Sequence, residues 1–434
     1  MSLRAILLLA VLIPSIPVCF WRPFYGVILW TIVAFASPQW YAWGSAFVFP
    51  TAELVAIPTI AGFLIFNRGW SRLVSRETFL LLLLILWFTI TSISADATPL
   101  FQDHVPDMWL RYQFVLKVIL MTFVTIGVVN SMARLRILFI TLGCCFSFYV
   151  VKALPFILMS GMSFRLYGPP RSMVEDNNDL GLALNMTLPI LFFLAQTETK
   201  VWSKRLFWFL FLVMIPGIFC TYSRGALVGL VAVMLMMFLR LKQRTVLIPV
   251  ALLGVIIVGL FAPESWKDRM NPARKGAVDN SAFSRLNSWT FAWRFTKDYP
   301  LTGGGFETFT KELFARYAAN PSDVHGPHSI YFGVLAEHGF FGLALYMSLV
   351  VSCFATGRRI VKWAHLHGDE VVAGYANMCQ FSIVGFLASG LFLGRAYFDY
   401  YYTIVACLVI LKKVAFAEWA ARESEVVEVA EQVA

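Results

Sequence analysis

Charged residues are scarce in this chain. Only 14% of its 434 residues are charged, against about 25% in ordinary soluble proteins. Hydrophobic residues make up 59%, and the mean hydropathy is +0.72. So little polar surface cannot cover a water-soluble globule, which excludes a cytosolic enzyme, a disordered chain and a nucleic-acid-binding protein as descriptions of the whole. The composition predicts a membrane protein that crosses the bilayer several times.

Cofactor and disulfide signals are missing too. The seven cysteines all lie in or beside apolar runs, and no Cys-x-x-Cys pair occurs. This pattern predicts free thiols, with neither disulfides nor a zinc site. The glycine run 303–305 is not followed by the Lys-Ser/Thr pair of a nucleotide-binding loop. We therefore expect no metal and no cofactor.

Apolar runs recur along the chain, and crossing a bilayer takes about 20 residues. The runs cover 5–20, 24–36, 47–66, 78–95, 109–129, 134–159, 178–195, 204–220, 224–240, 245–261, 329–356, 374–394 and 397–411. The first two are short and interrupted by proline, so they form either one broken element or two helices. We expect an all-α polytopic membrane protein of about 12 transmembrane helices, in which the long polar loop 262–328 forms a small helical subdomain. The divisions are N-terminal helices 1–214, a core 215–356, and C-terminal helices with a tail 357–434.

Basic residues cluster at every second loop, which assigns these loops to one side of the membrane. The positive-inside rule makes that side the cytoplasm. The clusters are Arg68, Arg72 and Arg76; Arg134 and Arg136; Lys200, Lys204 and Arg205; Arg240, Lys242 and Arg244; Arg358, Arg359 and Lys362; Lys412 and Lys413. The loop 262–328 then lies outside the cytoplasm. The acidic C-terminal tail lies inside it, as a disordered segment or a short helix, and the side of the N-terminus stays open.

The net charge of +10 (35 − 25) is not explained by these clusters alone. Further cations fall on the outer side, where topology does not require them: Arg165, Arg171, Arg224, Arg285 and Arg395. They either snorkel beside anionic lipid or gather around an anionic substrate. Arg224 begins an apolar helix, where a guanidinium fork and the helix N-terminus both suit a phosphate. For Arg395 the two interpretations stay equal.

The long outer loop contains one amphipathic stretch. Over 284–297, Leu286, Trp289 and Trp293 share one helical face, which predicts a helix lying on the outer membrane surface. Pro300 and the glycines 303–305 end this helix. The glycines either offer backbone N–H groups to a phosphate or make only a turn.

Histidine is rare, and His328 is the one best placed for chemistry. It lies where the outer loop meets an apolar helix, and near neutrality an imidazole accepts a proton from an attacking hydroxyl. A polar residue that merely starts the helix is an equal alternative. His338 follows ten residues later, about 15 Å deeper if the helix is continuous. It approaches the same site only if 329–338 lie flat or the helix breaks near Gly339.

These residues carry a resemblance. His328-Ser329, nine residues, then Gly339-Phe-Phe-Gly resembles the His-Asn/Ser-x9-Gly-x-x-Gly signature of bacterial O-antigen ligases. The segment 222–225, Tyr-Ser-Arg-Gly, is similar to the element that opens the core of the O-antigen ligase/polymerase superfamily. The stretch from Arg285 to 300–306 is similar to the outer loop of this superfamily, and residues 165–178 show a weaker similarity to it. The N-terminal third resembles exosortase-associated O-glycosylation ligases.

The resemblance implies a GT-C type glycosyltransferase of the bacterial inner membrane that needs no metal. It implies transfer of a glycan from undecaprenyl pyrophosphate to lipid A–core oligosaccharide at the periplasmic face. Arg224 and Arg285 would hold the donor pyrophosphate, and His328 would activate the acceptor hydroxyl. Arg165 and Arg171 would assist at the donor.

Three alternatives remain at this stage. An O-antigen polymerase or a protein O-oligosaccharyltransferase would use the same donor, and a transporter of lipid-linked glycans would also need a basic cavity.

Two lysines, Lys117 and Lys152, lie within apolar runs, where a charged residue usually faces a cavity or a partner. Both would suit the path of the donor lipid, and snorkelling is a rival explanation for Lys152.

Overall fold

The computed structural model describes residues 2–42, 49–66, 69–241, 248–249, 262–270 and 280–433, which form helices and loops without a β-strand. The all-α prediction is therefore confirmed for this part of the chain. Among the described helices, eight are long and apolar enough to cross a membrane, and two more are apolar but shorter. The predicted span 245–261 lies outside the described residues, apart from 248–249.

The helices follow the predicted runs closely. In chain order they are α1 (Leu3–Trp21), α2 (Pro23–Phe35), α3 (Thr51–Phe66), α4 (Arg76–Asp96), α5 (Val105–Val128), α6 (Met132–Met159), α7 (Asn177–Thr197), α8 (Val201–Cys220), α9 (Arg224–Arg240), α11 (Glu264–Met270), α12 (Asn280–Asp298), α13 (Lys311–Tyr317), α14 (Ile330–Leu366), α15 (Glu370–Gly390) and α16 (Asp399–Val433). The first two runs are two helices, because α1 continues through its internal prolines and a new helix begins at Pro23. Proline suits that first position, since its missing N–H would have no helical partner.

The core of the bundle is built around α7 and α15. α7 is buried along nearly its whole length, and α15 packs against α7, α9 and α14. The Asn185 side-chain amide donates to the Ala226 carbonyl (2.7 Å) and the Ser389 hydroxyl (3.1 Å). A buried amide needs such partners inside a membrane protein. These bonds hold the first turn of α9 beside the last turn of α15.

α14 is broken at Gly339. This residue has φ +70 and ψ −175, so two helical pieces meet there at a kink. The loop 300–305 supplies the hydrogen bonds that the helix loses. The Gly304 and Gly305 N–H groups donate to the Ala336 and Glu337 carbonyls (3.0 and 2.9 Å), and the Phe340 N–H donates to the Pro300 carbonyl (2.8 Å). The glycine run therefore docks on the helix break. Its N–H groups at 304 and 305 are used inside the protein, so the idea that they hold a phosphate is wrong.

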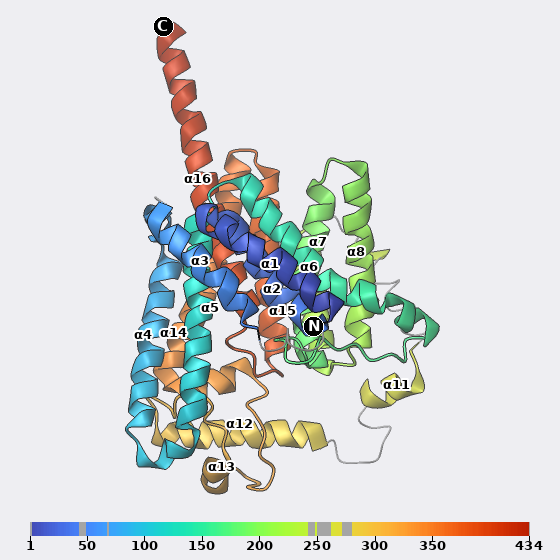
Figure 1. Cartoon of the computed structure of the whole chain (residues 1–434), viewed down its shortest axis with the longest axis vertical. Helices are drawn as coiled ribbons and strands as arrows, with labels where there is room; N and C mark the ends of the chain where they lie inside the picture. The colour runs from blue at the N-terminus through green and yellow to red at the C-terminus, as the bar shows by residue number, and fades with distance from the viewer. Residues whose placement is uncertain are drawn as a thin grey trace.

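The outer loop forms a helical layer across one end of the bundle. Figure 1 shows α12 running across this end, roughly perpendicular to α4 and α5, with α13 beneath it. α12 packs against α14 and α13, which covers its buried residues Phe291 and Phe295. The predicted helix over 284–297 is confirmed. Its position at the membrane surface stays a prediction.

The C-terminal tail is neither disordered nor a separate short helix. It continues α16, which has 35 residues and projects beyond the other end of the bundle (Figure 1). The projection is anchored at its base, where the Trp419 ring stacks on His367 at 4.6 Å between centroids. The expectation of a disordered or short tail is therefore corrected.

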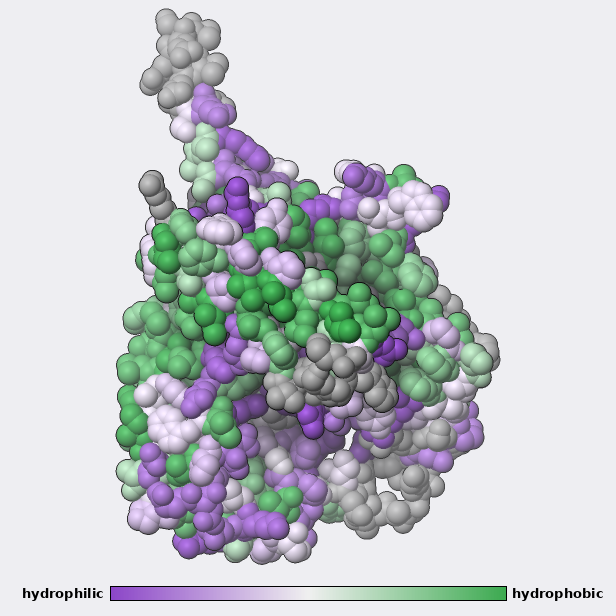
Figure 2. All heavy atoms as spheres, in the orientation of Figure 1, coloured by the Kyte–Doolittle hydropathy of each residue, from purple (hydrophilic) through white to green (hydrophobic). Residues whose placement is uncertain are grey.

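The bundle has two polar ends. Figure 2 shows hydrophobic residues in a band across the middle and hydrophilic residues gathered towards both ends. At one end, here called the site face, α7, α9 and α14 begin and α6, α8 and α15 end. At the other, the opposite face, Arg72 donates to the Gly127 carbonyl (2.6 Å) and Arg136 pairs with Glu198 (2.6 Å). The basic clusters of the described loops thus share one face, as predicted.

Candidate functional site

Arg224 is positioned by a tight turn between two apolar helices. α8 ends at Cys220, and the Ser223 hydroxyl caps α9 by accepting the Ala226 N–H at 3.1 Å. Tyr222 adopts φ +56, a left-handed conformation that a non-glycine residue adopts only when its surroundings enforce it. Its hydroxyl donates to the Met162 carbonyl (3.1 Å). The turn therefore fixes Arg224 at the first residue of α9, on the site face.

The loop 160–176 brings Arg165 beside this turn. The Leu166 N–H donates to the Cys220 carbonyl (2.8 Å), and Arg165 donates to the Asn177 side-chain oxygen (2.8 Å). Asn177 in turn donates to the Thr221 carbonyl (2.6 Å). Arg165 is thus linked through one amide to the turn that carries Arg224.

Arg285 reaches the same region from α12. Its guanidinium carbon lies 5.9 Å from the centre of the Phe392 ring. On the other side, Gly225 packs so closely on Phe392 that an added Cβ would lie 3.3 Å from the Phe392 Cβ. The structure therefore places Arg285 and the start of α9 against one phenylalanine in the loop after α15.

His328 faces this group of residues. Its backbone has φ +45, immediately before Ser329 and the start of α14. Burial lowers the pKa of His328 below its usual 6.5, and the neighbouring Arg285 and His325 lower it further, against an opposing effect of Asp176. The lowered pKa favours the neutral imidazole. His328, Arg285, Arg224 and Arg165 form the candidate site.

An apolar groove adjoins the candidate site. It lies between α12 and the first part of α14 and has a volume of about 530 Å³. Its lining is mostly aromatic and aliphatic, with two cations, and includes Leu286, Trp289, Trp293, Arg294, Lys297 and Phe332. Trp289 stacks on Phe332 (5.2 Å) and donates to the Pro327 carbonyl (3.2 Å). The groove therefore lies between the helix that carries Arg285 and the first part of the helix that follows His328.

Three predicted site residues lie elsewhere or have another partner. Arg395 forms an ion pair with Asp179 (2.5 Å), which ties the loop before α16 to the first turn of α7. Arg171 lies over Trp40 at 5.9 Å, and Lys152 lies over the Tyr41 ring at 3.8 Å. These contacts place Arg171 and Lys152 next to the segment 38–41, away from α12.

His338 is enclosed by a different set of residues. The helix break that would let it approach is present, at Gly339. The ring is nevertheless fully buried, stacks on Phe88 (4.1 Å) and bonds to the Thr91 hydroxyl (2.8 Å). Its described ring contacts and side-chain hydrogen bond are with α4, Phe306 and Tyr397, and none is with His328. Its inclusion as an additional site residue gains no support from this packing.

Two family models match segments of this chain. Residues 186–347 match the family model described as O-antigen ligase. This match supports the resemblance of the chain to the O-antigen ligase superfamily over these residues. A second model, described as a family of unknown function (DUF5935), matches residues 3–199. A search of the curated proteins found no match.

The candidate residues are distributed over the two matched segments. Arg224, Arg285 and His328 lie in the O-antigen ligase segment, whereas Arg165, Arg171 and Lys152 lie in the segment of unknown function. The family is one of glycosyltransferase-like enzymes with ligase or polymerase function. Both segments contribute to the site face, since Arg165 is linked through Asn177 to the turn before Arg224.

Several residues of the site region are not evident from the sequence. Asn177 and Phe392 connect elements that lie far apart in the chain, and neither carries a motif of its own. Glu337 is another: it accepts the Tyr397 hydroxyl at 2.5 Å and the Glu307 N–H at 3.1 Å. The weaker similarity at 165–178 was the available signal for Asn177. For Phe392 and Glu337 the sequence offered none.

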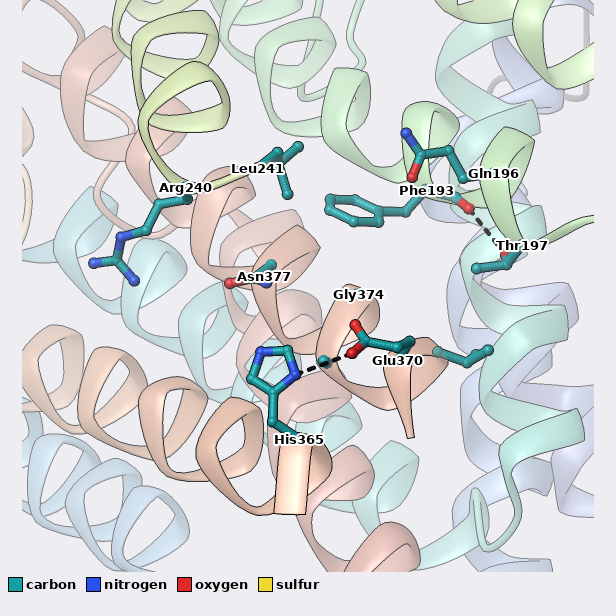
Figure 3. Close-up of a pocket in the computed structure, with 11 residues that line it drawn as sticks. Phe193, Gln196, Thr197, Arg240, Leu241, His365, Glu370, Gly374 and Asn377 are labelled. Atoms are coloured by element: carbon teal, nitrogen blue, oxygen red, sulfur yellow. Dashed lines mark hydrogen bonds and ion pairs between the residues drawn. The ribbon is translucent and has the colours of Figure 1, made fainter. Parts of the chain in front are cut away.

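A second cavity lies at the opposite face. It measures about 600 Å³ and is lined by residues from α7, α9, α14 and α15, among them Phe193, Arg240, His365, Glu370 and Asn377 (Figure 3). His365 and Glu370 pair there at 3.2 Å. Arg240 ends the 17-residue helix that Arg224 begins. At 1.5 Å per residue these two arginines are roughly 24 Å apart along α9, so the cavity is separate from the candidate site.

Potential metal ligands do not gather in the described ranges. No three side chains of His, Cys, Asp or Glu lie together there in a way that could hold a metal ion. The seven cysteines are free, and six of them are buried. The expectation of free thiols that face lipid or the core agrees with these positions.

Proposed function

We propose that this protein is an O-antigen ligase that transfers a glycan from undecaprenyl pyrophosphate to lipid A–core oligosaccharide. The site face would lie on the periplasmic side of the bacterial inner membrane, because the basic clusters mark the opposite face as cytoplasmic. The helical bundle with an outer helical layer suits a GT-C type enzyme. The observation that carries the proposal is the meeting of Arg285, His328 and the Arg224 turn within the segment that matches the family.

The arginines supply what the donor needs. A sugar on a polyprenyl pyrophosphate is already activated, and its transfer releases a strongly negative leaving group. One guanidinium group can donate two hydrogen bonds to two oxygens of a phosphate. Hydrogen-bond donors that are already positioned near a developing negative charge stabilise the transition state by several kcal/mol. Arg224 and Arg285 would hold the pyrophosphate, and Arg165 would support the turn that precedes Arg224. Arg171 lies further off, over Trp40, and would contribute only to the surrounding positive field.

His328 would act as the general base. A base must be unprotonated before it accepts the proton of the acceptor hydroxyl, and the lowered pKa of His328 favours this state. The hydroxyl oxygen would attack the anomeric carbon as the bond to the pyrophosphate oxygen breaks. One direct displacement inverts the configuration at that carbon. These steps need no metal and no cofactor.

The apolar groove supports a lipid-linked donor. An isoprenoid chain is apolar and unsaturated, and the groove offers Leu286 and Trp289 on the helix that carries Arg285, together with Phe332. Burying such a chain contributes about 25 cal/mol per Å² of apolar surface. The groove would therefore hold the first part of the polyprenyl chain while the arginines hold the pyrophosphate.

The test is a transfer assay with purified full-length protein in lipid nanodiscs. Undecaprenyl-pyrophosphate glycan and lipid A–core are supplied with EDTA and without nucleotide, and the product is followed by its mass. We expect transfer by the wild type and a loss of roughly 10²–10⁴-fold in kcat for His328→Ala. Wild-type activity in the His328→Ala variant would remove the base assignment.

The same assay separates the alternatives. Transfer to another donor glycan in place of lipid A–core would indicate a polymerase, and transfer to a protein would indicate an O-oligosaccharyltransferase. A protein that moves the donor across vesicle membranes without transferring its glycan is a transporter, and this outcome would end the ligase proposal.

A further inference from the structure

The two lysines within the membrane-spanning helices have different surroundings. Lys117 on α5 pairs with the Glu53 carboxylate of α3 at 3.0 Å. Lys152 on α6 lies over the neutral Tyr41 ring, 3.8 Å from its centre. A charge inside a membrane protein normally has a partner of opposite sign. Lys117 has that partner in the chain, and in the described ranges Lys152 does not.

A second cation is held at the same tyrosine. Arg4, at the start of α1, donates to the Tyr41 carbonyl at 3.4 Å. Among the residues that the structure describes, neither Arg4 nor Lys152 forms an ion pair. Two like charges at one residue repel each other, more strongly where the dielectric constant is low. An anion between them would turn this repulsion into attraction.

The surroundings of both cations are apolar and exposed. Leu3 and Ile6 flank Arg4, and Phe148 and Val151 precede Lys152, with 73%, 50%, 45% and 38% of their surfaces exposed. Exposed apolar side chains on a membrane protein face lipid. α6 continues for seven residues beyond Lys152 to Met159, about 10 Å at 1.5 Å per residue. With α6 spanning the bilayer and ending at its outer surface, this depth would correspond to the boundary between hydrocarbon and headgroups, where lipid phosphates lie.

The pair is connected to the candidate site through one loop. Trp40 and Tyr41 belong to the short helix η1 (Pro38–Tyr41), and Arg171 lies over Trp40. Arg171 belongs to the loop 160–176, whose Arg165 donates to Asn177 beside the Arg224 turn. A lipid held at Tyr41 would therefore reach the site face next to the donor.

We propose that Arg4, Lys152 and Tyr41 form a binding site for the phosphate of a membrane-embedded glycolipid, and that this glycolipid is the acceptor. The identity as acceptor rests on the proposed function, while the phosphate site does not. The ammonium and the guanidinium bind the phosphate oxygens from two sides, and the sugar portion extends towards His328. The segment of unknown function thereby supplies acceptor recognition, and the O-antigen ligase segment supplies donor recognition.

The test measures lipid binding and glycan transfer separately. Full-length protein in nanodiscs of neutral lipid is titrated with lipid A–core, with the same glycolipid lacking its phosphates, with undecaprenyl pyrophosphate and with phosphatidylglycerol. The variants are Arg4→Gln, Lys152→Gln, the double variant and the charge-conserving Lys152→Arg. Lys117→Gln serves as the matched control, because it removes a membrane lysine that has its own carboxylate.

We expect the double variant to bind phosphorylated glycolipid roughly 10- to 30-fold more weakly. Affinities for the dephosphorylated glycolipid and for the donor stay unchanged, Lys152→Arg stays near wild type, and KM for the acceptor rises with kcat unchanged. If the double variant binds the glycolipid with unchanged affinity, the proposed phosphate site is wrong, and Arg4 and Lys152 are snorkelling residues. Equal competition by phosphatidylglycerol overturns the assignment to the acceptor. Phosphate-dependent binding without any transfer by the wild type refutes the proposed function and leaves the phosphate site standing.

Discussion

The two ends of the helical bundle use arginine differently. At the opposite face, Arg72 and Arg136 are bound to a backbone carbonyl and a carboxylate of neighbouring helices, so their charges hold the bundle together. At the site face, Arg285 and His328 lie close together, and Arg165 donates to a neutral amide. Arginine thus stabilises the fold at one end, and at the other we propose that it binds an anionic substrate.

Arg395 shows that position alone does not decide the role. It lies at the site face, yet its ion pair with Asp179 gives it the structural role seen at the opposite face. The surroundings of each cation therefore distinguish the two roles better than the side of the membrane does. Each of the following predictions challenges this distinction.

The largest contrast is expected between Arg285→Gln and Arg136→Gln. Loss of Arg285 removes a donor that stabilises the leaving group, so transfer falls roughly 10²–10³-fold while the melting temperature changes little. Loss of Arg136 leaves Glu198 without its cation, so the melting temperature falls while the remaining folded protein transfers glycan normally. The measurements are initial transfer rates and thermal unfolding in the same detergent. Equal losses of activity in both variants would contradict the distinction.

Gly339→Ala should lower both stability and activity. The residue has φ +70, and an added Cβ would collide with the carbonyls of Pro300 and Leu301. Left-handed strain in a non-glycine residue costs about 1–3 kcal/mol, and the collision displaces the loop that follows α12. Gly368→Ala is the control, because it also has a positive φ of 66 but has no atom within 4 Å of an added Cβ. Denaturant or thermal unfolding checks the result, and identical losses in the two variants would exclude the docked loop as the cause.

Arg395→Gln should reduce stability more than catalysis. The substitution leaves Asp179 buried without its partner, and breaking such a pair costs about 3–5 kcal/mol in a fully buried setting and less here, where Arg395 is partly exposed. Asp179→Asn combined with Arg395→Gln should recover much of this loss. Thermal unfolding of the single and double variants measures the coupling. A pronounced loss of glycan transfer at unchanged stability would indicate that Arg395 binds the donor.

The smallest effect is a shift in the pH profile. Only neutral His328 accepts a proton, so kcat/KM should rise with pH through a midpoint below 6.5 and reach its plateau before neutrality. Arg285 lowers the pKa of His328, so Arg285→Gln should move that midpoint to higher pH. Profiles of kcat/KM between pH 4.5 and 8 would show it, and a midpoint that stays fixed would mean that Arg285 and His328 do not interact.

The sequence predicts the helices well because apolar runs and their ends are local signals. It also predicts the helix over 284–297 and offers the break at Gly339 as one alternative. It does not predict the docking of the glycine run, since the partners Ala336 and Glu337 lie more than thirty residues away. The pair of Arg395 and Asp179 joins residues 216 positions apart. Such contacts arise from the packing of whole helices, which hydropathy does not specify.

The C-terminal tail illustrates a second limit. Its acidic composition favours a solvated segment, and α16 nevertheless continues through it to Val433. The Trp419 ring is buried against His367, which anchors the helix where it leaves the bundle. Helix formation propagates easily from an anchored turn, so the local composition does not end the helix.

Locating the bound donor is the most direct test of the proposal that Arg285 and the helices α12 and α14 bind it. A photoreactive undecaprenyl pyrophosphate is cross-linked to the full-length protein in nanodiscs, and the labelled peptides are identified by mass spectrometry. If the donor binds as proposed, we expect labels on α12 and the first part of α14, around Leu286, Trp289 and Phe332. These labels should be lost when Arg285 is replaced by Gln. Labels at the opposite face, around Phe193 and Asn377, with none near Trp289, would contradict it.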